Sequence, residues 1–331
     1  MSFRFNEIIG QSEIKDYFKS AIEKKRLVHA YIISGDDLSG KMMMAETVAC
    51  ALLCESDGVE PCNECTPCHK VMNHNHPDVI YVQHEKPNNI SVDEIREQLV
   101  NTVLERPYSS DRKIYIIPDA EKMNQQAQNA LLKTIEEPPE FVTIFLLTNN
   151  QNAFLPTILS RCVKISLKPV DNALVERHLM DKCQVPDYIA KEAAAFAQGN
   201  VGLAQSLVSS DEFREEREAF VSLVRDIFEL KVFEIAAKAK ELAKNKEELP
   251  KLMNMLRVWF RDVLLYKATN DDTYLIYGTN LSHIESFCGV KYENLEKILV
   301  EIDNAEDKLR ANVNPEQVIE LLLVKIKEYI Q

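Results

Sequence analysis

The chain has 331 residues, of which 46% are hydrophobic, and a formal net charge of −13 at pH 7. This length suits two or three domains with buried cores. Acidity spread along the chain argues against a protein that coats nucleic acid by itself, because phosphate binding needs clustered Lys and Arg. The opening MSFRFNEIIG lacks the pattern of a secretion signal, and no apolar run approaches the ~18 residues of a membrane span, so we expect a cytoplasmic protein.

The first half of the chain alternates short apolar runs with amphipathic stretches. Continuous apolar strands separated by helices are typical of a parallel sheet covered on both faces. Five strands are predicted, at residues 30–33, 79–82, 114–117, 142–147 and 163–167. A helix is predicted from the capping-box pattern of Ser91 and Glu94 to about Leu104, and another from about Asn124 to just before Pro138.

After about residue 168 the strand signals stop. Three short helical patterns follow, at residues 171–182, 186–197 and 201–208. Gly199 is placed to end the middle one. Longer amphipathic helices then continue to the end, the last of them opening at Pro315. The predicted fold class is α/β with helical additions, divided into an α/β domain at 1–168, a small helical domain at 169–209 and a larger all-α domain at 210–331.

The first motif is the loop GDDLSGKM at residues 35–42, between a predicted strand and a predicted helix. In a phosphate-binding loop, backbone N–H groups and the helix N-terminus hold phosphate oxygens and a lysine neutralises their charge. Gly35, Gly40 and Lys41 fit those roles. Met42 stands where a Ser or Thr hydroxyl should bind magnesium, and two aspartates add negative charge. The loop therefore predicts no hydrolysis, and its shape fits both a weak nucleotide site and a turn that has lost its ligand.

The second motif is KIYIIPDAE at residues 113–121. Phosphate-loop ATPases end such a strand with one carboxylate on magnesium and a second that orients water. Here Pro118 follows the strand and offers no carboxylate, while Asp119 takes the second place. Two features needed for magnesium chemistry thus fail independently, at Met42 and at Pro118, which indicates lost catalysis.

Four cysteines share the spacing C-x7-C-x2-C-x2-C, and they are Cys54, Cys62, Cys65 and Cys68. Four thiolates so spaced can close a tetrahedral zinc site, and a set made only of cysteine is typical of a structural site. The alternatives are a redox pair, unrelated thiols, or a substituted ligand from Cys50 or His69. A cytoplasmic protein keeps its thiols reduced, which favours metal over disulfides.

The Ser-Arg-Cys motif at residues 160–162 precedes the last predicted strand. An isolated arginine beside a strand is usually a surface residue or a salt-bridge partner, so Arg161 by itself predicts no function.

Together these residues resemble the bacterial clamp-loader branch of the AAA+ ATPases. The resemblance rests on the cysteine module, on Ser-Arg-Cys, and on the segments FNEIIGQ at 5–11, HAY at 29–31, NALLKTIEEPP at 129–139 and NVNP at 312–315. It implies a DNA polymerase III hetero-pentamer with motor (gamma/tau) and delta subunits, which handles a sliding clamp and primer-template DNA in replication. It also implies structural zinc in the cysteine module, a helical lid at 169–209 and an oligomerisation collar at 210–331.

The resemblance further implies that ATP lies at subunit interfaces. Arg161 would reach as a finger in trans to the γ-phosphate on the neighbouring motor subunit. A motor subunit would carry a phosphate-sensing arginine where this chain has Gly202. Three altered positions beside an intact finger imply a member with no intrinsic activity that completes its neighbour's site.

Two other interpretations stay open. The chain could be an active, divergent clamp-loader ATPase that uses Lys41, with Asp119 serving the metal. The cysteine module could also bind DNA or RNA, although its nearby cations are limited to Lys70 and three histidines, without interleaved aromatic residues.

Overall fold

The computed structural model describes residues 3–56, 58–86, 89–227, 231–245, 248–311 and 313–330. Asn312 of the NVNP segment therefore lies outside the described residues. The chain divides into two compact units, Met1–Val175 with Gly199–Leu203, and Glu176–Gln198 with Ala204–Gln331. Residues of the predicted lid fall in both units, and the division into three domains stays a prediction.

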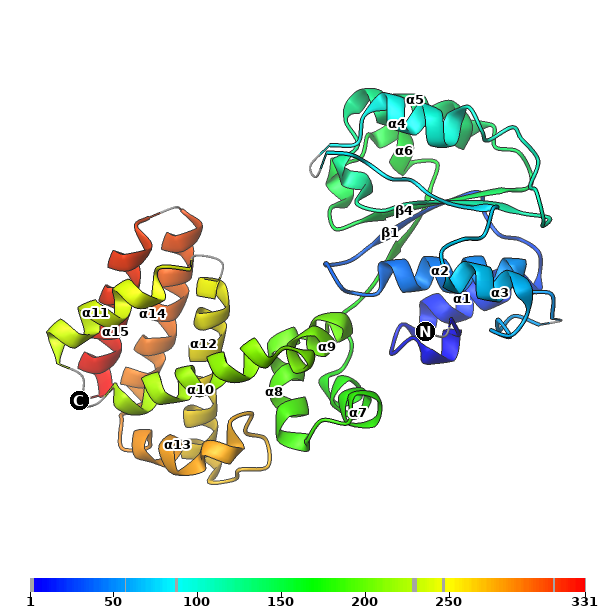
Figure 1. The fold of residues 1–331 in the computed structure, drawn as a ribbon. Coiled ribbons are helices and arrows are strands. Elements are labelled where there is room, and N and C mark those ends of the chain that lie inside the picture. Colours follow the sequence, from blue (N-terminus) through cyan, green and yellow to red (C-terminus); the bar gives the residue numbers. More distant parts are fainter. Residues whose placement is uncertain are drawn as a thin grey trace. The chain divides into compact units, whose positions relative to one another are not determined.

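The first unit is built on a five-stranded parallel sheet in the order β2-β3-β4-β1-β5. Its strands are β1 Ala30–Ser34, β2 Val79–Tyr81, β3 Lys113–Ile117, β4 Val142–Thr148 and β5 Val163–Ser166. Figure 1 labels two of these strands, β1 and β4. All five predicted strands and their parallel arrangement are confirmed. Strand β4 is central, and β1 pairs with β4 on one side and with β5 on the other.

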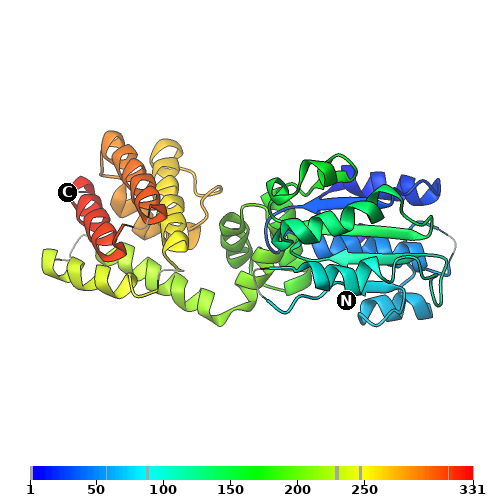
Figure 2. The ribbon, with the colours of Figure 1, turned by 90° about the horizontal axis from the view of Figure 1, so that it is seen from above.

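Helices cover both faces of the sheet, as the continuous apolar strands predict (Figures 1 and 2). Because side chains alternate along a strand, Tyr31 and Ile33 enter one core while Ala30 and Ile32 enter the other. The first core lies under α1 Ser12–Glu23, α2 Lys41–Leu53 and α3 Thr66–Met72. The second lies under α4 Val92–Ile95, α5 Gln125–Glu136 and α6 Pro156–Leu159.

The predicted capping box is present at the start of α4. The Ser91 hydroxyl accepts from the Glu94 N–H at 3.3 Å, and the Glu94 carboxylate accepts from the Ser91 N–H at 2.6 Å. The regular helix is shorter than predicted, because a π-helical segment follows at Arg96–Val100 and only turns reach Leu104. Thr102 contributes to this change, since its hydroxyl donates back to the carbonyls of the preceding turn.

After β5 the chain is helical. Its helices are α7 Asn172–Cys183, α8 Asp187–Ala197, α9 Val201–Ser209, α10 Asp211–Asp226, α11 Val232–Leu242, α12 Leu249–Thr269, α13 Leu281–Phe287, α14 Tyr292–Arg310 and α15 Pro315–Ile330. The three short predicted helices are confirmed, and Pro315 is the first residue of α15. In the second unit, the described core gathers around the fully buried Trp259 of α12. Within the described ranges, no helix is both long enough and apolar enough to cross a bilayer.

A buried ion pair joins α8 to α10 in the second unit. The fully buried Glu192 carboxylate accepts from Nη2 of Arg217 at 2.8 Å and also from its Nε. Arg217 donates further to the Thr279 hydroxyl at 3.1 Å. Burial raises the pKa of Glu192, and the guanidinium of Arg217 opposes that shift. Arg217 therefore supplies the counter-ion that a charged Glu192 needs in the core.

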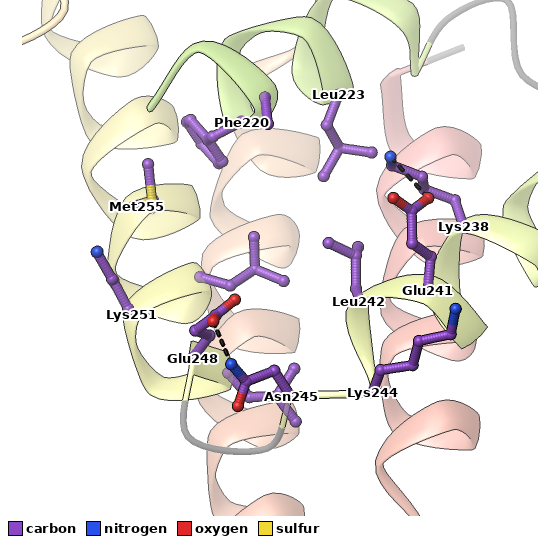
Figure 3. Close-up of a pocket in the computed structure, with 13 residues that line it drawn as sticks. Phe220, Leu223, Lys238, Glu241, Leu242, Lys244, Asn245, Glu248, Lys251 and Met255 are labelled. Carbon is purple, nitrogen blue, oxygen red and sulfur yellow. Dashed lines mark hydrogen bonds and ion pairs between the residues drawn. The ribbon is translucent and has the colours of Figure 1, made fainter. Parts of the chain in front are cut away.

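A pocket of about 230 Å³ lies between α10, α11 and α12 (Figure 3). Apolar side chains including Phe220, Leu223 and Leu242 line it, together with charged residues such as Lys238 and Glu241. Lys238 and Glu241 pair with each other at 3.0 Å. The pocket belongs to the second unit, whereas the sequence motifs with chemical meaning lie in the first.

Candidate functional site

The predicted phosphate loop lies between the end of β1 and the start of α2. The Gly35 N–H donates to the Thr148 carbonyl at 3.1 Å, which ties the loop to β4. A Cβ on Gly35 would lie 2.6 Å from the Ser39 hydroxyl oxygen, and Gly40 has a φ of +94° at the helix N-cap. Gly40 is therefore needed for the left-handed turn of the loop, whereas a side chain at Gly35 would require the Ser39 hydroxyl to shift.

Lys41 turns back onto its own loop. Its Nζ donates to the carbonyls of Gly35 at 2.6 Å and Asp36 at 2.7 Å, and lies 3.9 Å from a carboxylate oxygen of Asp37. The side chain is only 12% exposed. The Lys41 ammonium, which would neutralise a phosphate, thus already donates its hydrogen bonds to oxygens of the loop itself.

A second segment of the first unit covers the loop. The Asn200 side-chain amide donates to the Asp37 carbonyl at 2.7 Å. A Cβ on Gly202 would lie 2.3 Å from the Leu38 carbonyl oxygen and 3.1 Å from the Leu38 Cβ. No side chain fits at Gly202 in this conformation, which gives a physical reason for glycine where the family resemblance implies a sensing arginine.

Met42 and Asp119, one from each of the two motifs that would bind magnesium in an active ATPase, both have other contacts in the structure. Met42 packs against the core on the α1–α3 side of the sheet. Asp119 follows β3 at the sheet edge where parallel strands end, the same edge as the loop. Its carboxylate accepts from Lys122 at 2.8 Å and lies 4.0 Å from His84 Nε2. The carboxylate that the active-ATPase interpretation assigns to metal is thus already paired with the ammonium of Lys122.

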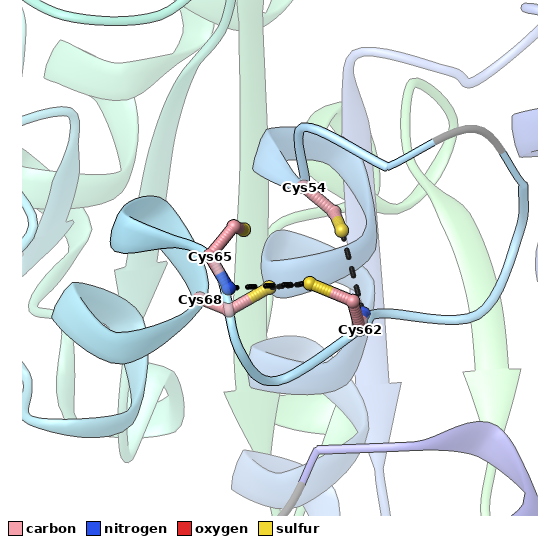
Figure 4. A group of neighbouring side chains, drawn as sticks. All are labelled: Cys54, Cys62, Cys65 and Cys68. Carbon is pink, nitrogen blue, oxygen red and sulfur yellow. Dashed lines mark hydrogen bonds between the residues drawn. The ribbon is translucent and has the colours of Figure 1, made fainter.

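The four predicted cysteines meet in one cluster (Figure 4). The sulfur atoms of Cys54, Cys62, Cys65 and Cys68 all lie within 4.8 Å of one another. Those of Cys62 and Cys68 are 3.9 Å apart, close to the ~3.8 Å between thiolates bound tetrahedrally at ~2.3 Å to one zinc ion. The cluster could therefore hold a metal such as zinc. Cys50 and His69, the two alternative ligands, do not belong to it.

Hydrogen bonds prepare this cluster for a cation. Cys62 Sγ accepts from the amides of Glu64 at 3.4 Å and Cys65 at 3.3 Å. The Ser56 hydroxyl, followed by these two amides, lowers the pKa of Cys62 to about 6. Thiolate is the form that binds metal, so these contacts favour the binding form of Cys62, whereas burial raises the pKa of Cys68.

The cysteine loop also anchors the start of the chain. The Phe3 N–H donates to the Asn63 side chain and the Phe5 N–H to the Glu60 carboxylate, each at 3.0 Å. Both phenylalanine side chains are buried in the α1–α3 core. Because the cluster shapes this loop, its integrity should affect the stability of the whole first unit.

Cys62→Ser should therefore release bound zinc and lower the Tm by about 5–10 °C, because metal binding to a structural site contributes to folding. Metal content by atomic absorption and thermal unfolding by circular dichroism would measure this. Cys183→Ser, outside the cluster on α7, is the matched control and should change neither quantity. An unchanged zinc content in the Cys62 variant would contradict a four-cysteine site.

Arg161 lies in the turn between α6 and β5, held by two hydrogen bonds and an ion pair. Nη1 donates to the Thr157 carbonyl at 3.0 Å and to the Ser160 hydroxyl at 3.2 Å, and Nη2 pairs with Glu136 at 2.8 Å. The side chain is 38% exposed. The next residue, Cys162, is buried, and burial raises the pKa of its thiol to about 12. The Ser-Arg-Cys motif thus combines a buried anchor with an accessible guanidinium.

The sheet register separates Arg161 from the phosphate loop of the same chain. Val163 pairs with Tyr31 and Ser166 with Ser34, so the turn at Arg161 lies at the edge where strands begin. The loop that starts at Gly35 lies at the opposite edge. The separation along the strands is roughly 20 Å at ~3.3 Å per residue, longer than an extended arginine side chain.

The parallel sheet, the phosphate-type loop after β1 and the helices that follow define the class of this chain, an AAA+ protein. A family model described as "DNA polymerase III, delta subunit" matches residues 10–171. The chain is 30% identical to DNA polymerase III subunit delta' of Bacillus subtilis, over 96% of each chain. It belongs to the DNA polymerase III delta' family.

A further delta' subunit agrees with this assignment, and a tau subunit shows similarity to another DNA polymerase III subunit. Subunit delta' of Pseudomonas aeruginosa is 29% identical over 90% of this chain and 91% of its own. Subunit tau of Bacillus subtilis is 30% identical over 80% of this chain but only 50% of its own length. Among solved structures, a gamma-subunit-related protein of Thermotoga maritima aligns over 96% of this chain and 99% of its own, with 21% identity and a TM-score of 0.40. A likeness at that level says nothing of function.

Sequence reasoning missed the partners of these residues. It did not identify Glu136 as the partner of Arg161, nor Asn200 as a residue that touches the loop. Glu136 stands in the NALLKTIEEPP segment, so that segment marked the region without giving the contact. For Asn200, which is 163 positions from Asp37, no local pattern carries the information.

Proposed function

We propose that this chain is a non-hydrolysing AAA+ subunit of the DNA polymerase III clamp loader, and that it donates Arg161 to the ATP site of a neighbouring motor subunit. The observation that carries the proposal is the place of Arg161, at the sheet edge opposite its own loop and partly exposed. A guanidinium so placed cannot serve its own nucleotide and is accessible to a second chain.

The state of the phosphate loop supports the absence of intrinsic hydrolysis. A nucleotide entering the loop would have to displace two hydrogen bonds of Lys41 and compete with the segment around Asn200. It would then find no hydroxyl at Met42 and no carboxylate at Pro118 to bind magnesium. Gly35, Gly40 and Lys41 keep the shape of the loop without its chemistry, and we infer that ATP binds weakly or not at all.

The partners follow from the family. We infer that gamma/tau motor subunits and a delta subunit join this chain in a hetero-pentamer, with residues 210–331 in an oligomerisation collar and residues 169–209 as a lid. The sliding clamp and primer-template DNA would be met through the complex. Similarity to proteins named delta' and tau supports this assembly, and the acidic net charge of −13 agrees with DNA contact that depends on the other subunits.

Reconstitution tests the proposal. The chain is mixed with the motor and delta subunits of its organism, and ATP turnover is measured with clamp and primed DNA. The chain alone should show no turnover, and the motor and delta subunits should gain stimulated turnover when it is added. Turnover by the chain alone that Lys41→Ala abolishes would overturn the proposal in favour of an active, divergent ATPase.

A further inference from the structure

We propose that Glu136 is a positioning residue for Arg161, and that its carboxylate oxygen fixes the guanidinium in the orientation in which it meets a neighbour's phosphate. This inference rests on the proposed function of Arg161. Glu136 is the last residue of α5 and Arg161 follows α6, so the contact joins two segments that the fold brings together.

The geometry leaves part of the guanidinium available. Arginine has five N–H donors in a planar fork. Nη1 makes two hydrogen bonds, to Thr157 and Ser160, and Nη2 makes an ion pair with Glu136 on the other side. Among the described residues, Glu136 is the one partner of this guanidinium outside its own turn. Apart from that ion pair, the N–H groups of Nη2 and Nε have no partner among the described residues, which leaves donors that a phosphate could use.

Positioning has to be weighed against charge compensation. A carboxylate beside the finger could reduce its positive charge and thereby weaken its effect on a phosphate. Both partners are substantially exposed, at 38% and 45%, so water and salt screen this charge. A fixed orientation is not screened, because an arginine held in place before the reaction loses less freedom when the transition state forms. We therefore assign the larger effect of Glu136 to orientation.

The two roles predict different results for neutral substitutions. The amide oxygen of Glu136→Gln can take the place of the carboxylate oxygen beside Nη2 and accept from it, so positioning should survive in that variant. Glu136→Ala removes the acceptor and should release the guanidinium. If charge compensation dominated instead, both variants would raise turnover.

The experiment measures kcat and KM for ATP in the reconstituted complex with clamp and primed DNA. Glu136→Ala should lower kcat by about two- to fivefold, the range that one exposed ion pair supports, with KM and assembly unchanged. Glu136→Gln should retain most of the kcat. Glu137→Ala, an exposed neighbour at the end of the same helix, is the matched control and should be silent.

A double substitution separates positioning from a structural role. In the Arg161→Ala background, Glu136→Ala should cause no further loss, since its effect passes through the arginine. A further loss there, or an unchanged or raised kcat in the single variant, would overturn the inference. If Arg161→Ala itself has no effect in an assembled complex, the proposed function fails and this inference fails with it. Thermal unfolding and gel filtration of each variant would show that the chain folds and assembles.

Discussion

Arg161→Ala is expected to silence the ATP site beside this chain while the complex still assembles. Arginine fingers are worth about 10³–10⁵ in kcat because they stabilise charge that develops on the transferred phosphoryl group. The side chain is partly exposed and lies beyond reach of its own loop, so its removal should leave the first unit intact. Single-turnover hydrolysis would show the effect as a fraction of bound ATP that is no longer cleaved.

Two further variants sharpen the Arg161 experiment. Arg161→Lys keeps the charge but loses the planar fork, so it should recover only part of the rate. Arg112→Ala removes another arginine near the same sheet edge, half-buried and just before β3, and should leave turnover unchanged. Equal single-turnover traces for wild-type and Arg161→Ala complexes of the same composition would contradict the role of Arg161 as an arginine finger.

Arg217→Ala is expected to destabilise the second unit by about 3–5 kcal/mol, because it leaves the buried Glu192 without its counter-ion. Urea-induced unfolding would measure the loss. The double variant Glu192→Gln with Arg217→Met, which removes both charges, should recover much of that stability. A loss below about 1 kcal/mol for Arg217→Ala would mean that the pair is not held as described.

The loss in Arg217→Ala should depend on pH. Burial already raises the pKa of Glu192 above its usual value of 4.5, and removal of the guanidinium should raise it further. A carboxyl whose folded pKa is raised binds its proton more tightly in the folded state, so stability falls as pH rises from the unfolded pKa toward the folded one. The variant should therefore lose least near pH 4 and most at neutral pH. A pH-independent loss would contradict a charge effect and point to packing alone.

How much of this structure the sequence predicts depends on how far apart in the chain the residues of each feature lie. The strands and the start of α4 depend on apolar runs and on a capping box within a few residues, and these were confirmed. The four cysteines were found because their ligand spacing is local. The reversal of Lys41 onto its own loop was not predicted, since it depends on which oxygens lie nearest after folding. The cover provided by Asn200 and Gly202 was missed for the same reason, because it joins segments far apart in the chain.

The close approach of Gly202 to Leu38 bears on how the chain could evolve. A threonine restored at Met42 would return one magnesium ligand, but an arginine could not be restored at Gly202 without moving the loop backbone, whose Leu38 carbonyl lies 2.3 Å from any added Cβ. A substitution at Gly202 therefore has to be accompanied by a rearrangement of the Leu38 backbone, whereas one at Met42 has no such requirement.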